Sequence, residues 1–329
     1  MKKLLTLLLC CTLLLSGCGP QPEPDNGKLK VVAAVFPAYD FARAAGGALA
    51  DVELLLPPGA ESHSYEPTPA DILAVQNCDL FIYLGGESDA WVDTILSSID
   101  MRGQVLRMVD SVELLEEETV EGMQEAPGHD HDHHDHEEDE DHHHEEDDHG
   151  LGAVIGMDEH VWTSPKNAAA ITRTIGAALG EADPANSAAY AAAAENYARQ
   201  IESLDREFAA FFDSRPDRTI VFGDRFPLRY FAEEYGLDYY AAFPGCGTQT
   251  EPSAATVAFL TDKVRREQLP TVWYIEFSNH LVADSIAEAA GVGTAMFHTC
   301  HNVSSEDLNS GATYLSLMRR NLETLRENM

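Results

Sequence analysis

Residues 29–36 read LKVVAAVF, a continuous apolar run that is typical of a strand covered on both faces of a parallel sheet. Two further runs, 51–56 (DVELLL) and 79–84 (DLFIYL), follow at intervals that leave room for a helix. A helix start stands at 68–71 (TPAD), with Thr as N-cap, Pro at the first helical position and an acid at the third. This alternation of strand and helix predicts an α/β domain with a parallel sheet.

The same alternation of strands and helices recurs in the second half of the chain and predicts a second α/β unit. Its strands are expected at 218–222 (RTIVF), 237–243, 271–277 (TVWYIEF) and 292–298, and its helices at 226–235, 252–268, 280–290 and from about 311.

One long helix is expected to connect the two units. Asp183-Pro184 offers a start, and nothing breaks the helix before Arg215-Pro216. Six apolar residues form a single stripe at helical spacing: Tyr190, Tyr197, Ile201, Leu204, Phe208 and Phe211. A helix of roughly 30 residues spans about 45 Å and would act as a stiff connection.

Length and charge limit the kinds of function that the chain can have. Its 329 residues predict about two domains. A net charge of −35 argues against nucleic acid as a partner, because phosphate backbones require a basic surface. Residues 113–149 carry 18 of the 56 acids and no Lys or Arg, so this stretch is an insertion in the N-terminal unit.

The first residues resemble a bacterial lipoprotein signal. Lys2 and Lys3 precede an apolar stretch, 4–15, that is too short to span a bilayer, and Leu15-Ser16-Gly17-Cys18 offers small residues before a Cys that would be lipidated. The alternative is a plain secretory peptide with an incidental Cys. We therefore expect an extracytoplasmic protein, lipid-anchored to the bacterial cell membrane, on the periplasmic side if there are two membranes.

Three cysteines outside this signal remain to be explained, and their compartment permits disulfides. Cys78 reads as a small buried residue at a helix-to-strand junction. Cys246 and Cys300 both follow predicted strands of the second unit and are the expected pair.

Residues 129–149 consist only of His, Asp and Glu, with nine His and twelve acids. Nothing in this tract can bury apolar surface, so it is expected to be disordered. A solvated charge run is the simpler interpretation, but imidazole is a common zinc, nickel and copper ligand. The tract is therefore predicted to bind several ions weakly as an auxiliary scavenger, through His129, His131, His133, His134, His136, His142, His143, His144 and His149.

Five His lie outside the tract, and three of them follow predicted strands or precede a helix start. His63 stands in a loop just beyond the strand 51–56, and His160 stands just before a helix that begins after Ser164. Ligands of parallel α/β sheets bind at the carboxyl ends of strands. Each His alone would be read as structural, but with His298 after the last strand they can converge on a cleft between the domains.

Three stretches carry a resemblance to a known family: LLLPPGAESHSYEPTPAD (54–71), MDEHVWTSPKN (157–167) and YLSLMRRNLETL (314–325). They resemble the zinc/manganese substrate-binding lipoproteins of ABC importers, the cluster A-I or ZnuA-like family, over essentially the whole mature chain. This implies two (β/α)4-type lobes joined by one long rigid helix, with a metal ion in the interlobe cleft. It also implies delivery of the ion to an ABC-type zinc permease and its ATPase, with no catalysis.

The resemblance assigns the first two metal ligands to His63 and His160. The family's third ligand has no counterpart, because Gly223 stands at its position in a segment with two extra residues. The fourth maps to His298. We expect His63, His160 and His298 to bind the ion, with Glu276 or His301 as the fourth ligand.

Three further residues near these positions have other expected roles. Asp224, beside the missing ligand, is a weaker substitute, and His280 is expected to be a surface helix residue. Cys300 would be a good zinc ligand as a thiolate, although the disulfide is preferred.

Three imidazoles and at most one carboxylate suit tetrahedral Zn²⁺, whereas Mn²⁺ favours oxygen ligands. Three alternatives stay open: a manganese-binding member of the family, a lipid-anchored adhesin or metal store, and a secreted zinc hydrolase with Glu276 or Asp224 as base. A monomer is expected. The predicted organisation is a signal peptide 1–17, a tether 18–28, an N-terminal lobe 29–166 with the loop 113–150, a helical segment 167–216 with the linking helix 184–213, and a C-terminal lobe 217–329.

Overall fold

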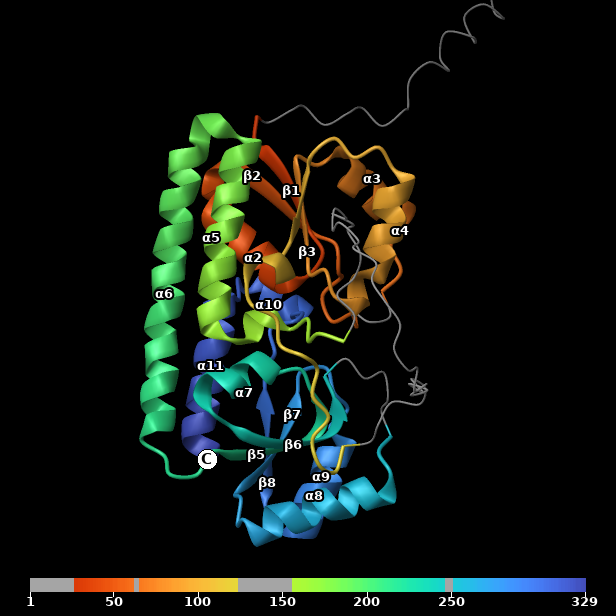
Figure 1. Ribbon diagram of the computed structural model, residues 1–329, viewed down its shortest axis with the longest axis vertical. Helices are drawn as coiled ribbons and strands as arrows, with labels where there is room; N and C mark the ends of the chain where they lie inside the picture. Colours follow the sequence, from red (N-terminus) through yellow and green to blue (C-terminus); the bar gives the residue numbers. More distant parts are fainter. Residues whose placement is uncertain (1–26, 62–64, 124–155, 246–250) are drawn as a thin grey trace, which may run out of the picture.

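The structure is a computed structural model that describes residues 27–61, 65–123, 156–245 and 251–329. Several sequence predictions lie outside the described residues: the signal peptide 1–17, Cys18, His63, Cys246 and the tract 129–149. Figure 1 shows an elongated molecule in which two α/β lobes are stacked along the long axis. This is the predicted class of fold.

The first lobe is built on four parallel strands in the order β2-β1-β3-β4. The strands are β1 (Leu29–Ala33), β2 (Ala50–Leu54), β3 (Leu80–Tyr83) and β4 (Gln104–Arg107). The helices are α2 (Phe36–Gly46), α3 (Pro69–Asn77) and α4 (Ala90–Ser98), with 3₁₀ turns at Gly47–Leu49, Glu87–Asp89 and Val109–Ser111. The central strand β3 is buried along its whole length, as its apolar run predicted.

The predicted start of α3 is confirmed. Thr68 Oγ1 accepts a hydrogen bond from the Asp71 backbone N–H, and the Asp71 carboxylate accepts one from the Thr68 N–H. This reciprocal cap ends the loop that follows β2 at a fixed point.

The second lobe repeats the design with the strand order β6-β5-β7-β8, again all parallel. The strands are β5 (Thr219–Phe226), β6 (Asp238–Pro244), β7 (Thr271–Ile275) and β8 (Gly293–Phe297). The helices are α7 (Arg229–Tyr235), α8 (Ala254–Arg266), α9 (Leu281–Ala290), α10 (Ser305–Asn309) and α11 (Tyr314–Asn328).

Strand β5 continues four residues beyond its predicted end. Phe222 pairs with Ala241 but Arg225 pairs with Phe243, so three steps along β5 match two along β6. This β-bulge accommodates extra chain and re-aims the side chains that follow it.

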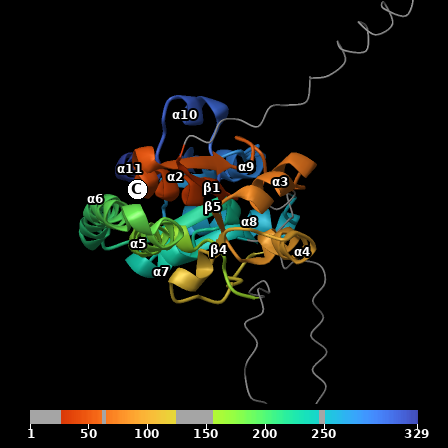
Figure 2. The same ribbon diagram turned by 90° about the horizontal axis from the view of Figure 1, so that it is seen from above.

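The long helix α6 (Ser187–Asp213) runs beside both lobes and lies against α5 (Pro165–Ala182) in Figures 1 and 2. It begins slightly later than predicted, because Pro184–Asn186 form a 3₁₀ turn. Its buried stripe ends with Phe212 instead of the predicted Phe211, since Phe212 follows Phe208 by one full turn. The helix packs on α2 of the first lobe and on α7 and α11 of the second, so one hydrophobic core extends through both lobes.

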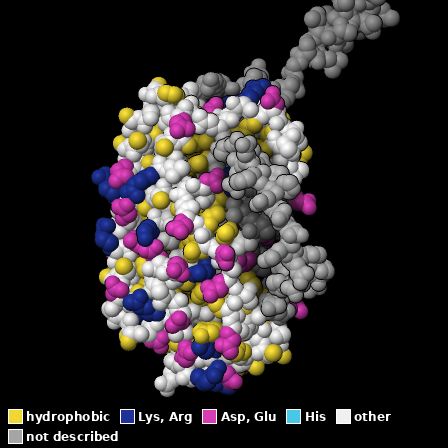
Figure 3. Space-filling model, in the orientation of Figure 1, with side chains coloured by type: hydrophobic (Ala, Val, Ile, Leu, Met, Phe, Trp, Pro, Cys, Tyr) yellow, Lys and Arg dark blue, Asp and Glu magenta, His cyan; other side chains and the backbone are white. Residues whose placement is uncertain are grey.

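Both sheets reverse strand order at their first strand, between β1 and β3 and between β5 and β7. Such switch points, at the carboxyl ends of the strands, are where α/β sheets bind ligands. Figure 3 shows acidic and basic side chains interspersed over one face of the molecule. None of the helices in the described ranges is long and apolar enough to cross a membrane.

Candidate metal centre

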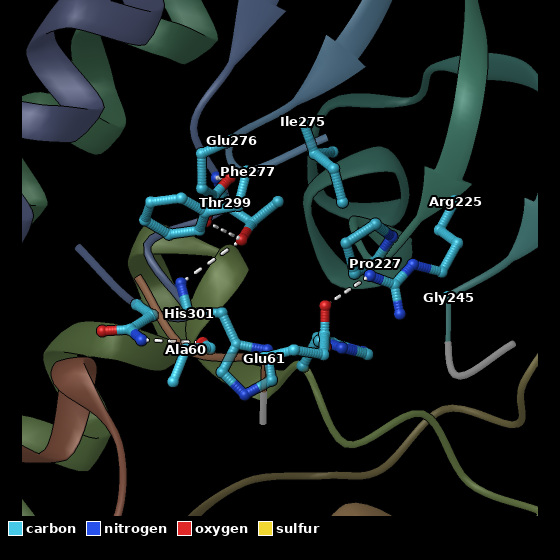
Figure 4. A pocket seen from close by; sticks show the side chains of 12 residues that line it. Ala60, Glu61, Arg225, Pro227, Gly245, Ile275, Glu276, Phe277, Thr299 and His301 are labelled. Atoms are coloured by element: carbon cyan, nitrogen blue, oxygen red, sulfur yellow. Dashed lines mark hydrogen bonds and ion pairs between the residues drawn. The ribbon is translucent and has the colours of Figure 1, made fainter. Parts of the chain in front are cut away.

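A small pocket lies between the lobes, where the loops after β2, β7 and β8 meet the end of β5 (Figure 4). Its cavity of about 40 Å³ has room for a few waters or one ion. Pockets for organic ligands are larger, about 300–1,000 Å³. The polar side chains that line it include Glu61, His160, Arg225, Glu276, Thr299 and His301.

His160 is almost fully buried and stands just before the 3₁₀ turn Val161–Thr163. Asp158 Oδ1 accepts hydrogen bonds from the His160 backbone N–H at 2.8 Å and from ring Nδ1 at 3.1 Å. Because a carboxylate can only accept, Nδ1 carries the proton of the neutral ring, and Nε2 keeps a lone pair for a metal ion. Histidine ligands of metals almost always have such an outer hydrogen-bond partner.

Two opposing effects act on the pKa of His160. Burial disfavours the charged ring, but the carboxylates of Asp158 and Glu159 outweigh it, so the pKa of His160 is raised above its usual value. The site around this imidazole therefore attracts positive charge.

His301 brings a second imidazole to the pocket from the other lobe. The ring centroids of His160 and His301 lie 5.6 Å apart, with the rings nearly perpendicular. The Trp162 ring lies 4.9 Å from that of His301, and its Nε1–H donates to the carbonyl oxygen of Thr299 at 2.9 Å. Trp162 thus holds the loop after β8 against the segment that carries His160.

His298 and Glu276 make hydrogen bonds that shape the loop after β8. Glu276 accepts from the Thr299 backbone N–H at 2.7 Å and from the Thr299 hydroxyl at 2.5 Å. The His298 ring Nδ1 accepts the Cys300 N–H at 3.0 Å, and Asn321 of α11 binds both the N–H and the carbonyl of His298. Glu276 lines the pocket but His298 does not, and the ligand role of each stays a prediction.

The loop after β2, which leads to His63, is fastened to the loop after β8. The Asn302 side-chain amide, which is buried, donates to the carbonyl oxygens of Pro57 at 2.8 Å and of Ala60 at 2.9 Å. His63 itself lies outside the described residues. Its chain position, two residues beyond the pocket-lining Glu61, keeps it a candidate ligand.

The structure explains why Gly223 stands where a ligand was expected. A Cβ atom on Gly223 would lie 2.3 Å from the Cα atom of Ala283 in α9, so no side chain fits there. Asp224 accepts the N–H of Arg225 through Oδ1 at 2.9 Å and is not among the residues that line the pocket. The ligand role of Asp224 stays a prediction that the pocket geometry does not support.

Sequence reasoning missed an ion pair in the pocket, between Arg225 and Glu61. Arg225 follows the bulge in β5, and its Nη2 atom lies 2.8 Å from Glu61 Oε2 across the cleft. The two extra residues in the segment that contains Gly223 were the one available signal, because an insertion in a strand shifts which side chain faces the cleft.

The two remaining candidates, His280 and Cys300, lie in different surroundings. His280 is exposed and its Nδ1 lies 2.8 Å from Asp284, as expected of a surface residue. Cys300 is a buried thiol whose pKa is raised by burial, and its bridge to Cys246 stays a prediction. Within the part of the chain that the structure describes, no three His, Cys, Asp or Glu form a ready-made metal cluster.

The family model "Zinc-uptake complex component A periplasmic" (ZnuA) matches residues 31–328. The chain is 29% identical over 330 residues to the zinc-binding lipoprotein AdcA of Streptococcus pneumoniae strain R6, covering 99% of this chain and 61% of that protein. It is also 29% identical over 334 residues to the high-affinity zinc uptake system protein ZnuA of Bacillus subtilis strain 168, covering 99% and 97%. The chain therefore spans less than two thirds of the streptococcal relative.

Solved structures give the same picture of the fold. The Zn(II)-bound ZnuA-like domain of S. pneumoniae AdcA matches with a TM-score of 0.71 and 26% identity over 92% of this chain and 99% of that one. The metal-dependent lipoprotein YcdH of B. subtilis matches with a TM-score of 0.72 and 26% identity over 92% and 100%. The laminin-binding protein Lmb of Streptococcus agalactiae, at 24% identity and a TM-score of 0.70 over 91% and 99%, shares the fold.

Proposed function

The chain belongs to the zinc-uptake complex component A family, and from this premise we propose that it captures Zn²⁺ outside the cytoplasm and delivers it to an ABC permease. The observation that carries the proposal is the meeting of His160 and His301, one from each lobe, at an ion-sized cavity. A cavity of about 40 Å³ also disfavours a hydrolase, which would need room for an organic substrate. The protein then binds and releases its cargo without chemistry.

We assign the ligands as His63, His160 and His301. Support for His160 comes from its orientation by Asp158, and support for His301 from its place in the pocket. His298 and Glu276 would then act by holding the loop after β8 in shape. This choice differs from the prediction that His298 binds the ion directly.

Zinc is the cargo that this ligand set favours. Neutral imidazoles with at most one carboxylate suit Zn²⁺ in tetrahedral geometry, whereas Mn²⁺ prefers a shell of oxygen atoms. The names of the two relatives, a zinc-binding lipoprotein and a zinc uptake protein, agree with this choice. Copper and nickel would also bind imidazoles, so selectivity also depends on which metal is available.

Partners and location follow from the family and from the N-terminal sequence. We propose that Cys18 carries a lipid, that residues 18–28 tether a monomer to the membrane, and that the permease and its ATPase receive the ion. The relative's description as a lipoprotein supports the anchor. The tract 129–149 would act as a scavenger that raises the local zinc concentration.

Metal analysis of the mature protein with residues 129–149 deleted tests this function. One tightly bound zinc per chain is expected, with fewer ions in total than the intact chain binds. His160→Ala and His301→Ala should each weaken zinc binding by orders of magnitude in competition with a chelator. His280→Ala is the matched control, because His280 is exposed and should leave affinity unchanged. Unchanged affinity in both pocket variants would refute the ligand assignment, and the absence of a tightly bound zinc would refute the function.

A further inference from the structure

One side chain of the second lobe takes part in a backbone ladder of the first. Residues 115–117 pair in antiparallel fashion with residues 156–158. The Asp158 N–H donates directly to the Leu115 carbonyl oxygen at 2.9 Å. The return bond of this pair passes through the hydroxyl of Tyr230 in α7, which accepts the Leu115 N–H at 3.1 Å and donates to the Asp158 carbonyl oxygen at 2.7 Å. Tyr230 therefore completes the ladder from the opposite lobe.

This hydroxyl lies one residue away from the side chain that orients a metal ligand. We propose that Tyr230 is a positioning residue for His160, and that it ties the orientation of this imidazole to the fit between the lobes. The inference rests on the proposed function and deepens it. The Asp158 carboxylate holds the His160 ring, and the Asp158 carbonyl oxygen binds the Tyr230 hydroxyl. A displacement of Tyr230 would thus reach the imidazole through a single residue.

Burial makes the Tyr230 hydroxyl difficult to replace. Tyr230 is 3% exposed and Asp158 is 1% exposed, so the hydrogen bond between them is shielded from solvent. Without the hydroxyl, the Asp158 carbonyl oxygen would lose this partner inside the protein. A buried polar group that loses its partner costs more free energy than the bond contributes net, so the backbone before His160 would shift to find another.

The segment 112–123, which we call the strap, is attached to the second lobe at further points. Glu118 Oε2 lies 3.2 Å from Arg229 Nε and accepts the Tyr239 hydroxyl at 3.1 Å. Farther along, a Cβ atom on Gly122 would lie 2.2 Å from an aromatic ring of α8, so the backbone of the strap packs closely on that helix. Figure 1 shows this segment, in yellow, running from the first lobe down across the second. The strap therefore holds its side of the ladder against the second lobe.

The residues after His160 are bound to the second lobe as well. The Trp162 Nε1–H donates to the Thr299 carbonyl oxygen, and the Trp162 carbonyl oxygen accepts the hydroxyl of Tyr314 in α11 at 2.9 Å. His160 thus lies between two points of attachment, Tyr230 on one side and Trp162 on the other. Separation of the lobes has to break both attachments, so opening of the pocket and loss of the ligand's orientation would occur together.

Tyr230→Phe tests the proposal in the mature protein, at less than one zinc per chain so that the tightest site fills first. Zinc affinity in chelator competition should fall about tenfold, mainly through faster dissociation, because one buried hydrogen bond is lost. Tyr235→Phe is the matched control. It removes a hydroxyl from another buried tyrosine of α7, one that donates to Asp205 of α6 at 2.8 Å, and it should leave the zinc affinity unchanged.

Two further readouts separate positioning from a general loss of stability. In a His160→Ala background, Tyr230→Phe should cause no further loss of zinc affinity, because no imidazole remains to be oriented, and the same tenfold loss there would overturn the proposal. Hydrogen exchange of the metal-free protein should show less protection of residues 156–162 in Tyr230→Phe than in Tyr235→Phe, and equal protection would overturn it as well. Parent affinity in Tyr230→Phe would reject the inference and keep the proposed function. A parent protein without a tightly bound zinc would refute the proposed function and this inference with it.

Discussion

The buried carboxyl group of Asp89 should make the stability of the metal-free protein fall as pH rises, and Asp89→Asn should remove that effect. Asp89 is 5% exposed, and its Oδ2 accepts the N–H groups of Leu84 at 2.7 Å and Gly85 at 3.2 Å. Burial, with the Glu159 carboxylate nearby, raises the pKa of Asp89 from 3.8 to about 7. An Asn oxygen can accept the same two hydrogen bonds without carrying charge.

The sign and size of the effect follow from linkage. Between pH 4 and 7 the folded chain holds the Asp89 proton more firmly than the unfolded chain, so the free energy of unfolding decreases with rising pH in this window. The pKa difference of about 3, at about 1.4 kcal/mol per unit, limits the loss to about 4 kcal/mol. Above pH 7 the loss is complete and constant.

Urea unfolding from pH 4 to 8 with a chelator present measures this directly. The free energy of unfolding of Asp89→Asn minus that of the parent should rise by up to about 4 kcal/mol across the window. Asp100→Asn, at an exposed position, serves as the control and should show a flat difference. A flat difference for Asp89→Asn as well would refute the claim that Asp89 is held in a protonated state by burial.

Two substitutions and one measurement on the unchanged protein test other parts of the structure. Asp158→Ala should weaken zinc binding about 10–100-fold in chelator competition, because the His160 ring loses the carboxylate that orients it. A zinc affinity equal to that of the parent protein would contradict this. Gly223→Ala should lower the free energy of unfolding by about 1–3 kcal/mol, since the added methyl group meets the α9 backbone; an unchanged thermal midpoint would disprove the close contact. Mass spectrometry of the unreduced protein tests the bridge that the sequence predicts between Cys246 and Cys300. A disulfide-linked peptide pair would support it, and two free thiols, as the structure has for Cys300, would refute it.

Most of the fold could be predicted because buried parallel strands appear in the sequence as apolar runs. The exception is β4 (Gln104–Arg107), which reads QVLR and is only partly buried at the edge of its sheet. A strand so short, with polar residues at both ends, has no pattern that distinguishes it from a loop. Its pairing with β3 in the folded sheet is what identifies β4 as a strand.

The candidate site was predictable to the extent that its residues stand in contiguous motifs. His160 follows Asp158 by two residues, so the imidazole and the carboxylate that orients it are visible together in the sequence. Glu61 and Arg225 are 164 residues apart and meet only because the β5 bulge turns Arg225 toward the other lobe. A single sequence gives the insertion but not the direction in which the next side chain points.

The different surroundings of His298 and His301 have a local cause in the backbone. Cys300, between them, has φ +62°, a left-handed conformation that a residue with a side chain adopts at a cost of about 1–3 kcal/mol. This turn lets the Cys300 N–H bind the His298 ring and the His301 N–H bind the Thr299 hydroxyl, and these bonds offset part of the strain. One imidazole is thereby turned inward and the other toward the pocket. The sequence HTCH (298–301) contains no glycine that would indicate a left-handed turn. From the sequence alone, His298 and His301 are therefore equivalent candidates for a metal ligand.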